Sequence, residues 1–195
     1  MIKDERVARL LKLMNAAFSP PAGIPRILLA LSFGFVCHGV FAAAIFAMIT
    51  AMFFGLSESF GTVPWPWAIL ANLILIGQFP LAHSILLSKR GGRLLRRLIP
   101  GPHGDTLATT TYAIIASAQL LALFAFWTPS GIVWWRAEGA AFWTLTTAYA
   151  ASWLLLTKSS FDAGAEVQSG ALGWLSLMAR IRPVFPEQSL NIFFH

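Results

Sequence analysis

Charged residues are scarce in this chain of 195 residues. They make up 11% of it, whereas about a quarter of an ordinary soluble domain is charged, and hydrophobic residues make up 57%. Several apolar runs reach the length that crosses a bilayer, so we expect lipid rather than water to be the main solvent of the chain. The composition therefore excludes an ordinary soluble domain and predicts one compact membrane domain.

Cysteine and the common short catalytic motifs are nearly absent as well. The single cysteine, Cys37, cannot form an internal disulfide, and its place inside an apolar run predicts a small buried side chain. The chain has no Cys-x-x-Cys-His, no His-Glu-x-x-His, no Walker loop and no Gly-x-Gly-x-x-Gly. Gly-x-Ser-x-Gly is also missing, so the sequence gives no indication of a serine hydrolase, and we expect no metal site.

The stretch from 68 to 97 is the most informative part of the chain. Residues 67–87 are almost wholly apolar and have the length of a helix that crosses a hydrocarbon core about 30 Å thick. Residues 88–97 follow at once with five Lys and Arg and no acid, and such clusters stay on the cytoplasmic side during insertion. Thirteen of the fourteen Lys and Arg fall on this side of the predicted spans, which predicts that both termini are cytoplasmic.

The hydropathy pattern predicts an all-α, polytopic membrane protein. It has four predicted transmembrane helices, at about 28–54, 68–87, 106–127 and 140–156. We expect Asp105 to cap the third of these helices, and Phe161 to Gly164 to form a turn after the fourth.

Interfacial helices are expected at both ends of the membrane domain. Residues 2–18 form a basic amphipathic pattern suited to an anionic membrane face, and 165–180 predict an interfacial helix or a re-entrant segment. The predicted organisation is a basic N-terminal segment, a four-helix membrane domain and a cytoplasmic or interfacial tail, at 1–26, 27–157 and 158–195. Because the net charge of +6 gathers at the ends of apolar runs, the expected partner is anionic membrane lipid and not nucleic acid.

Polar residues inside the second and third predicted spans are candidates for a site. His83 follows Pro80 by three residues and shares a helix face with Asn72. Pro80 removes one backbone hydrogen bond, and a polar stripe beside such a defect faces protein or a water-filled cavity. Tyr112 and Gln119 share a face of the third span by seven-residue spacing. The residues alone leave a ligand site and helix packing both open.

Two histidines in neighbouring spans, His38 and His83, also fit the axial ligands of a haem b. Counted from the cytoplasmic boundary, the two differ in depth by about 9 Å. A tilt of the helices or a kink at Pro80 would have to bring the two histidines to the same depth, so haem stays an alternative cofactor.

Three segments carry a resemblance to a known family: Gln78 to Pro100, Thr106 to Tyr112 and Gly131 to Gly139. They resemble small multi-pass bacterial membrane proteins that include the NnrU-type proteins, the methanethiol S-methyltransferases and the isoprenylcysteine carboxyl methyltransferase-like enzymes. In that family the corresponding places carry Gln-His-Ser followed by basic residues, a Ser/Thr-Thr-Tyr and a Val-Trp. Two places differ from the family: Ala82 stands where the family usually has Gln, and residues 161–168 replace a more apolar, Arg-containing stretch.

The resemblance implies an S-adenosylmethionine-dependent methyltransferase of the bacterial inner membrane. It implies that His83 and Tyr112 are catalytic and orient or deprotonate a thiol or carboxyl acceptor. We expect the substrate to be bound by Asn72, Ser84 and Gln119. In the methyltransferase branch the cofactor site begins at an Arg-His-Pro-x-Tyr segment, and the expected cofactor ligand at that place is His195. The sequence as given is then expected to hold the substrate-side helices and to stop before the cofactor part.

Two other functions stay open. The chain fits a non-catalytic accessory subunit that docks onto a larger membrane complex, because small residues recur every fourth position along the first span, at Gly39, Ala43, Ala47 and Ala51. It also fits a haem-binding or isomerase-like relative of the NnrU group.

Overall fold

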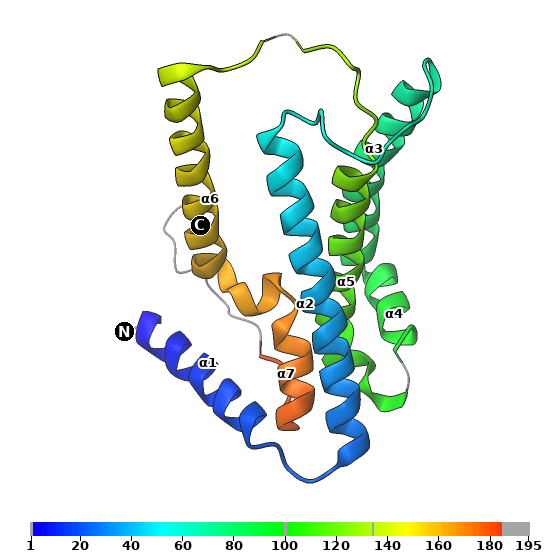
Figure 1. Cartoon of the computed structure of the whole chain (residues 1–195). Coiled ribbons are helices and arrows are strands. Elements are labelled where there is room, and N and C mark those ends of the chain that lie inside the picture. Colours follow the sequence, from blue (N-terminus) through cyan, green and yellow to red (C-terminus); the bar gives the residue numbers. More distant parts are fainter. Residues whose placement is uncertain (1, 100, 134, 185–195) are drawn as a thin grey trace.

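The computed structural model describes residues 2–99, 101–133 and 135–184, and this part of the chain contains helices and no strand. Figure 1 shows the arrangement of these helices. The helices are α1 (Ile2–Phe18), α2 (Ile24–Phe53), α3 (Trp67–Leu87), α4 (Lys89–Arg97), the short 3₁₀ helix η1 (Gly101–His103), α5 (Gly104–Ala125), α6 (Gly139–Gln168) and α7 (Ala171–Ala179). The predicted all-α class is confirmed.

Three helical stretches among the described residues are long and apolar enough to cross a membrane, so the chain is a multi-pass membrane protein. They are α2, α3 and the continuous stretch Gly101–Ala125 that contains α5. The helix α2 begins four residues before the predicted start, at Ile24, because Pro25 is favourable in the first turn of a helix. The helix α6 is 30 residues long but is not one of these three stretches, since several Thr residues make its first half less apolar. The fourth span therefore stays a prediction.

The helix α5 is the centre of the bundle. It is in contact with α2, α3, α4 and α7. The loops that follow α2 and α5 lie at the upper end of Figure 1, and the connections before α2 and before α5 lie at the lower end. The upper half of α6 stands apart from α2 in this view. The side chain of Tyr149 on α6 nevertheless reaches α2. Its hydroxyl donates a hydrogen bond of 2.7 Å to the carbonyl oxygen of Ile49, and Phe53 lies against its ring.

The last described helix, α7, falls in the segment that was predicted to be an interfacial helix or a re-entrant segment. Most of it is buried: Leu172, Gly173, Ser176, Leu177, Met178 and Ala179. It packs against α1, α2 and α5, and its leucines join Leu13 of α1 and Leu107 of α5 in the hydrophobic core. The apolar residues of α7 therefore surround the helix instead of forming one face, which is the pattern of an interior helix.

Both ends of α7 have polar groups that satisfy its backbone. Gly170, with φ +75°, precedes its first turn in the left-handed conformation that glycine adopts without strain. At the other end, the Arg26 guanidinium donates to the carbonyl oxygens of Leu177, at 2.6 Å, and Met178. A cation at a helix C-terminus is favourable, because the last carbonyl groups carry partial negative charge. Arg26 therefore ties the first turn of α2 to the end of α7.

Two local predictions need correction. The predicted turn is confined to Gly164: Phe161 to Ala163 are helical, and Gly164, with φ 105°, kinks α6 between two helical parts. Asp162 can remain in the helix because it pairs with Lys158, one turn earlier. The predicted cap of α5 is also absent: the N-cap position is His103, and no side-chain hydrogen bond caps the helix. Asp105 lies in the first turn and pairs with Arg96, at 3.4 Å between Nε and Oδ1.

Candidate functional site

Three polar pairs join α3 to α5 and to the loop that follows α5. They are Asn72 with Thr128, Gln78 with Gln119, and His83 with Tyr112. Along α3 the residue numbers rise while along α5 they fall, which is the register of two antiparallel helices. The structure thus brings together four of the six residues predicted for the site, in one helix contact.

Asn72 fixes the loop after α5. Its amide nitrogen donates to the carbonyl oxygen of Thr128, and its amide oxygen accepts the N–H of the same residue, both at 2.9 Å. The side-chain amide thereby forms two hydrogen bonds with the backbone of a single residue. Its donors and acceptor are engaged within the protein, and the geometry supports a structural role better than substrate binding.

Gln119 and Gln78 form a second two-way contact. Nε2 of Gln119 donates to Oε1 of Gln78 at 2.7 Å, and Nε2 of Gln78 donates to the carbonyl oxygen of Gln119 at 3.0 Å. The Oε1 atom of Gln119 is buried and has no hydrogen-bond partner among the described residues. This oxygen is the one acceptor in the contact that a ligand or a water molecule could satisfy.

His83 and Tyr112 form the third pair, and it is the one with reactive groups. The Tyr112 hydroxyl lies against the His83 ring, hydrogen-bonded to Nδ1 and 3.1 Å from Nε2. The ring of Phe79, one helical turn before His83, lies 5.5 Å from the imidazole. Both members of the pair are partly exposed. In the neutral tautomer in which Nδ1–H donates to the Tyr112 oxygen, Nε2 of His83 carries the lone pair that a general base needs.

Two further predicted site residues do not join this group. Ser84 is exposed on α3 next to His83. His195 lies outside the described residues. The structure therefore tests neither the substrate contact of Ser84 nor the cofactor contact of His195, and both stay predictions.

The haem alternative gains no support from the histidine contacts. His38 is exposed on α2, and its ring meets the edge of Trp174 of α7 at 5.7 Å. His83 is engaged with Tyr112 of α5. The two imidazoles face different helices, whereas two axial ligands of one haem must face each other across the iron. Within the described residues, no three His, Cys, Asp or Glu lie close enough to hold a metal ion.

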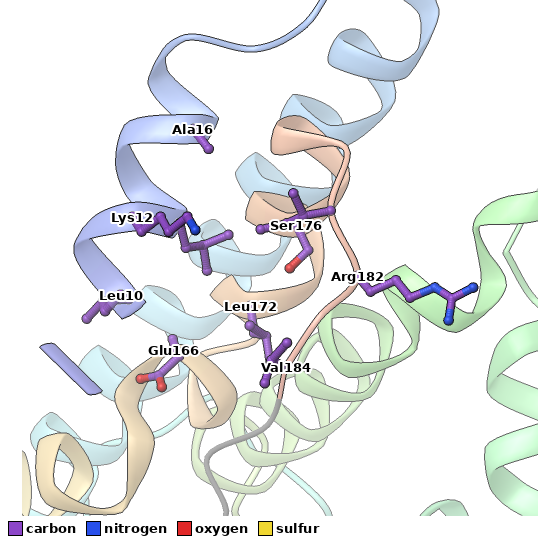
Figure 2. Close-up of a pocket in the computed structure, with 10 residues that line it drawn as sticks. Leu10, Lys12, Ala16, Glu166, Leu172, Ser176, Arg182 and Val184 are labelled. Carbon is purple, nitrogen blue, oxygen red and sulfur yellow. The ribbon is translucent and has the colours of Figure 1, made fainter. Parts of the chain in front are cut away.

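A cavity of about 370 Å³ opens between α1 and α7, and the sequence analysis did not predict it (Figure 2). Its walls are mainly apolar, with Leu10, Leu13 and Ala16 on one side and Leu172 on the other. The polar residues at the cavity are Lys12, Glu166, Ser176 and Arg182. Because 158–195 was expected to lie outside the membrane domain, no pattern in the sequence placed α7 beside α1.

Fold and contacts together define an all-α, multi-pass membrane protein with a His–Tyr pair between two of its spans. Comparison with known proteins narrows this class. The chain is 30% identical over 100 residues to the methanethiol S-methyltransferase of Pseudomonas deceptionensis, a match that covers 50% of this chain and 36% of that protein. It is 31% identical over 98 residues to the enzyme of that name from Crocosphaera subtropica, covering 48% and 36%. A third relative, methanethiol S-methyltransferase 1 of Bradyrhizobium diazoefficiens, is 32% identical over 95 residues, covering 48% and 32%.

The comparisons confirm the predicted resemblance to membrane methyltransferase-like proteins. The match spans about a third of the length of each of these relatives. No family model matches the chain, and no solved structure matches it.

Proposed function

We propose that this chain takes part in methyl transfer to the sulfur of a small thiol, and that the acceptor binds beside His83 and Tyr112. The observation that carries the proposal is the contact between these two side chains in a chain whose relatives are methanethiol S-methyltransferases. The pair lies in the contact between two membrane helices, where a small apolar thiol can reach it from lipid.

The acceptor must lose a proton for the transfer to occur. A thiol with an ordinary pKa near 8.5 is mostly protonated at neutral pH, whereas the thiolate is the nucleophile. Low polarity disfavours the thiolate further, so a base next to the sulfur is needed. The unprotonated Nε2 of His83 takes that proton as the carbon–sulfur bond forms. Tyr112 fixes the ring and its tautomer, because its oxygen accepts the N–H of Nδ1.

S-Adenosylmethionine is the donor that the proposal requires, and it supplies a methyl group already activated on a sulfonium. A site for it needs polar partners for adenine, ribose and the amino-acid end. The cavity between α1 and α7 is mostly apolar, and it lies on other helices than the α3–α5 pair. We therefore assign none of the described residues to the donor.

The test is a reaction with purified full-length chain in lipid nanodiscs, supplied with S-adenosylmethionine and methanethiol. The proposal expects dimethyl sulfide and S-adenosylhomocysteine to form in equal amounts, and neither to form with empty nanodiscs. Absence of both products, together with no S-adenosylmethionine binding by calorimetry, would refute it. The non-catalytic alternative stays a prediction, and co-purification at fixed stoichiometry with a larger membrane complex would favour it.

We further infer that the chain resides in the inner membrane of a bacterium, with both termini in the cytoplasm. The distribution of Lys and Arg supports this orientation, since nine of the fourteen lie before α2 or in α4.

A further inference from the structure

We propose that the cavity between α1 and α7 binds one acyl chain of an anionic phospholipid, whose phosphate is bound by Lys12. The proposal does not depend on methyl transfer, because the cavity and the His83–Tyr112 pair lie on different helices.

The walls of the cavity are suited to a hydrocarbon chain. Leu10, Leu13 and Ala16 of α1 face Leu172 of α7 across it, and Ile181 and Val184 add to the apolar lining. Lys12 is exposed and extends from α1 toward α7 in Figure 2. An ammonium group beside an apolar cavity matches an amphiphile with an anionic head and a hydrocarbon tail.

Ser176 provides a second, independent indication of a ligand. Its side chain lines the cavity and is 1% exposed, yet its hydroxyl has no hydrogen-bond partner among the described residues. A buried hydroxyl without a partner is unfavourable, so a ligand that accepts its proton gains affinity. The ester carbonyl of a glycerophospholipid is such an acceptor, and it lies between the phosphate and the acyl chain.

The charged residues at the cavity identify Lys12 as the group that binds the headgroup. Glu166 and Arg182 also border the cavity, and a carboxylate cannot bind a phosphate. In Figure 2 the Arg182 guanidinium is directed away from Lys12 and Ser176. The cation that faces the cavity is therefore Lys12.

The first experiment is native mass spectrometry of the full chain released from vesicles of phosphatidylglycerol or phosphatidylcholine. The wild type is expected to retain one phosphatidylglycerol in preference to phosphatidylcholine. Lys12→Gln is expected to lower that retention about fivefold. Ala16→Trp, which fills the cavity, is expected to abolish it. The matched control is Lys89→Gln, which removes an exposed cation of α4 far from the cavity and should leave retention unchanged.

The second experiment isolates the hydroxyl of Ser176. Diester phosphatidylglycerol should bind better than its diether analogue, which lacks the carbonyl groups, and Ser176→Ala should remove that difference. A variant that merely loosens the fold would weaken both lipids alike. Equal retention of the two lipids by the wild type and by Ser176→Ala would overturn the role of the hydroxyl.

A photoreactive phenylalanine analogue in place of Val184, which is exposed at the edge of the cavity, identifies the occupant directly. Capture of a phospholipid supports the proposal. Capture of a peptide from this chain would show that the chain fills its own cavity, and retention that inorganic phosphate abolishes would show a headgroup site without an acyl chain. Either of these results contradicts the proposal.

Discussion

The hydroxyl of Thr110 on α5 donates a hydrogen bond of 2.6 Å to the carbonyl oxygen of Gly170, in the turn between α6 and α7. The hydroxyl oxygen of Thr110 also accepts the backbone N–H of Trp174 at 3.0 Å, near the start of α7. Thr110 is fully buried, so water cannot replace it in either bond. One side chain therefore joins α7 to the central helix of the bundle.

We expect Thr110→Val to destabilise the protein by about 1–3 kcal/mol, because it leaves two buried backbone groups without a partner. The neighbouring Thr111→Val is a matched control. The Thr111 hydroxyl is buried without a partner, so its replacement by a methyl group should be neutral or slightly stabilising. Unfolding of both variants in mild detergent, followed by circular dichroism, measures the difference. Equal losses of stability in the two variants would show that the hydrogen bonds of Thr110 contribute nothing to the stability of the fold.

Gly173 allows α7 to approach α5 closely. A Cβ added there would lie 2.4 Å from Oγ1 of Thr110 and 2.8 Å from the carbonyl oxygen of Thr106. We therefore expect Gly173→Ala to cost about 1–3 kcal/mol through overpacking. Gly39→Ala is its control, since a Cβ at Gly39 meets nothing within 4 Å. That change should stabilise α2 slightly, as alanine is the better helix former. A control that destabilised as much as Gly173→Ala would exclude close approach as the cause.

The membrane helices were predictable from the sequence because length and hydropathy decide them. The second span was predicted at about 68–87 and is Trp67–Leu87 in the structure. The helix α7 was not predictable in the same way. Its apolar residues number too few for a span, and only its contacts with α1, α2 and α5 show that it is an interior helix. Such contacts are tertiary and leave no periodic signal in one sequence.

The packing faces show the same limit. The recurring small residues of α2 predicted a contact at Gly39, Ala43, Ala47 and Ala51. Of these Ala51 is buried, but Gly39 and Ala43 are exposed, and other buried positions such as Gly34 and Cys37 lie on another face than Gly39. Seven-residue spacing on α5 did group Tyr112 with Gln119, and both meet α3. Spacing can show which residues share a face, but which neighbour covers that face depends on the whole bundle.

The proposed base is tested by changes in the α3–α5 pair. His83→Gln should lower kcat for the thiol about a hundredfold or more, because positioned proton transfer contributes that much, while the KM changes little. Tyr112→Phe should lower kcat about tenfold, since it removes one hydrogen bond that orients the ring. The control is His38→Gln, which changes a histidine of another span that contacts Trp174 instead. Wild-type kcat for a folded His83→Gln variant would remove this residue from the mechanism.

Cysteine labelling tests both the orientation and the fourth span. The native Cys37 is buried, so the unmodified chain should stay unlabelled by a membrane-impermeant maleimide. Because basic segments stay inside, Ser130→Cys should react in intact cells, whereas Lys89→Cys should react only after permeabilisation. Thr157→Cys lies past the middle of α6 and is exposed. If α6 crosses the bilayer, Thr157→Cys should react only after permeabilisation, as Lys89→Cys does. Reaction of Thr157→Cys in intact cells would leave α6 on the outer side, and reaction of Lys89→Cys there would reverse the orientation of the chain.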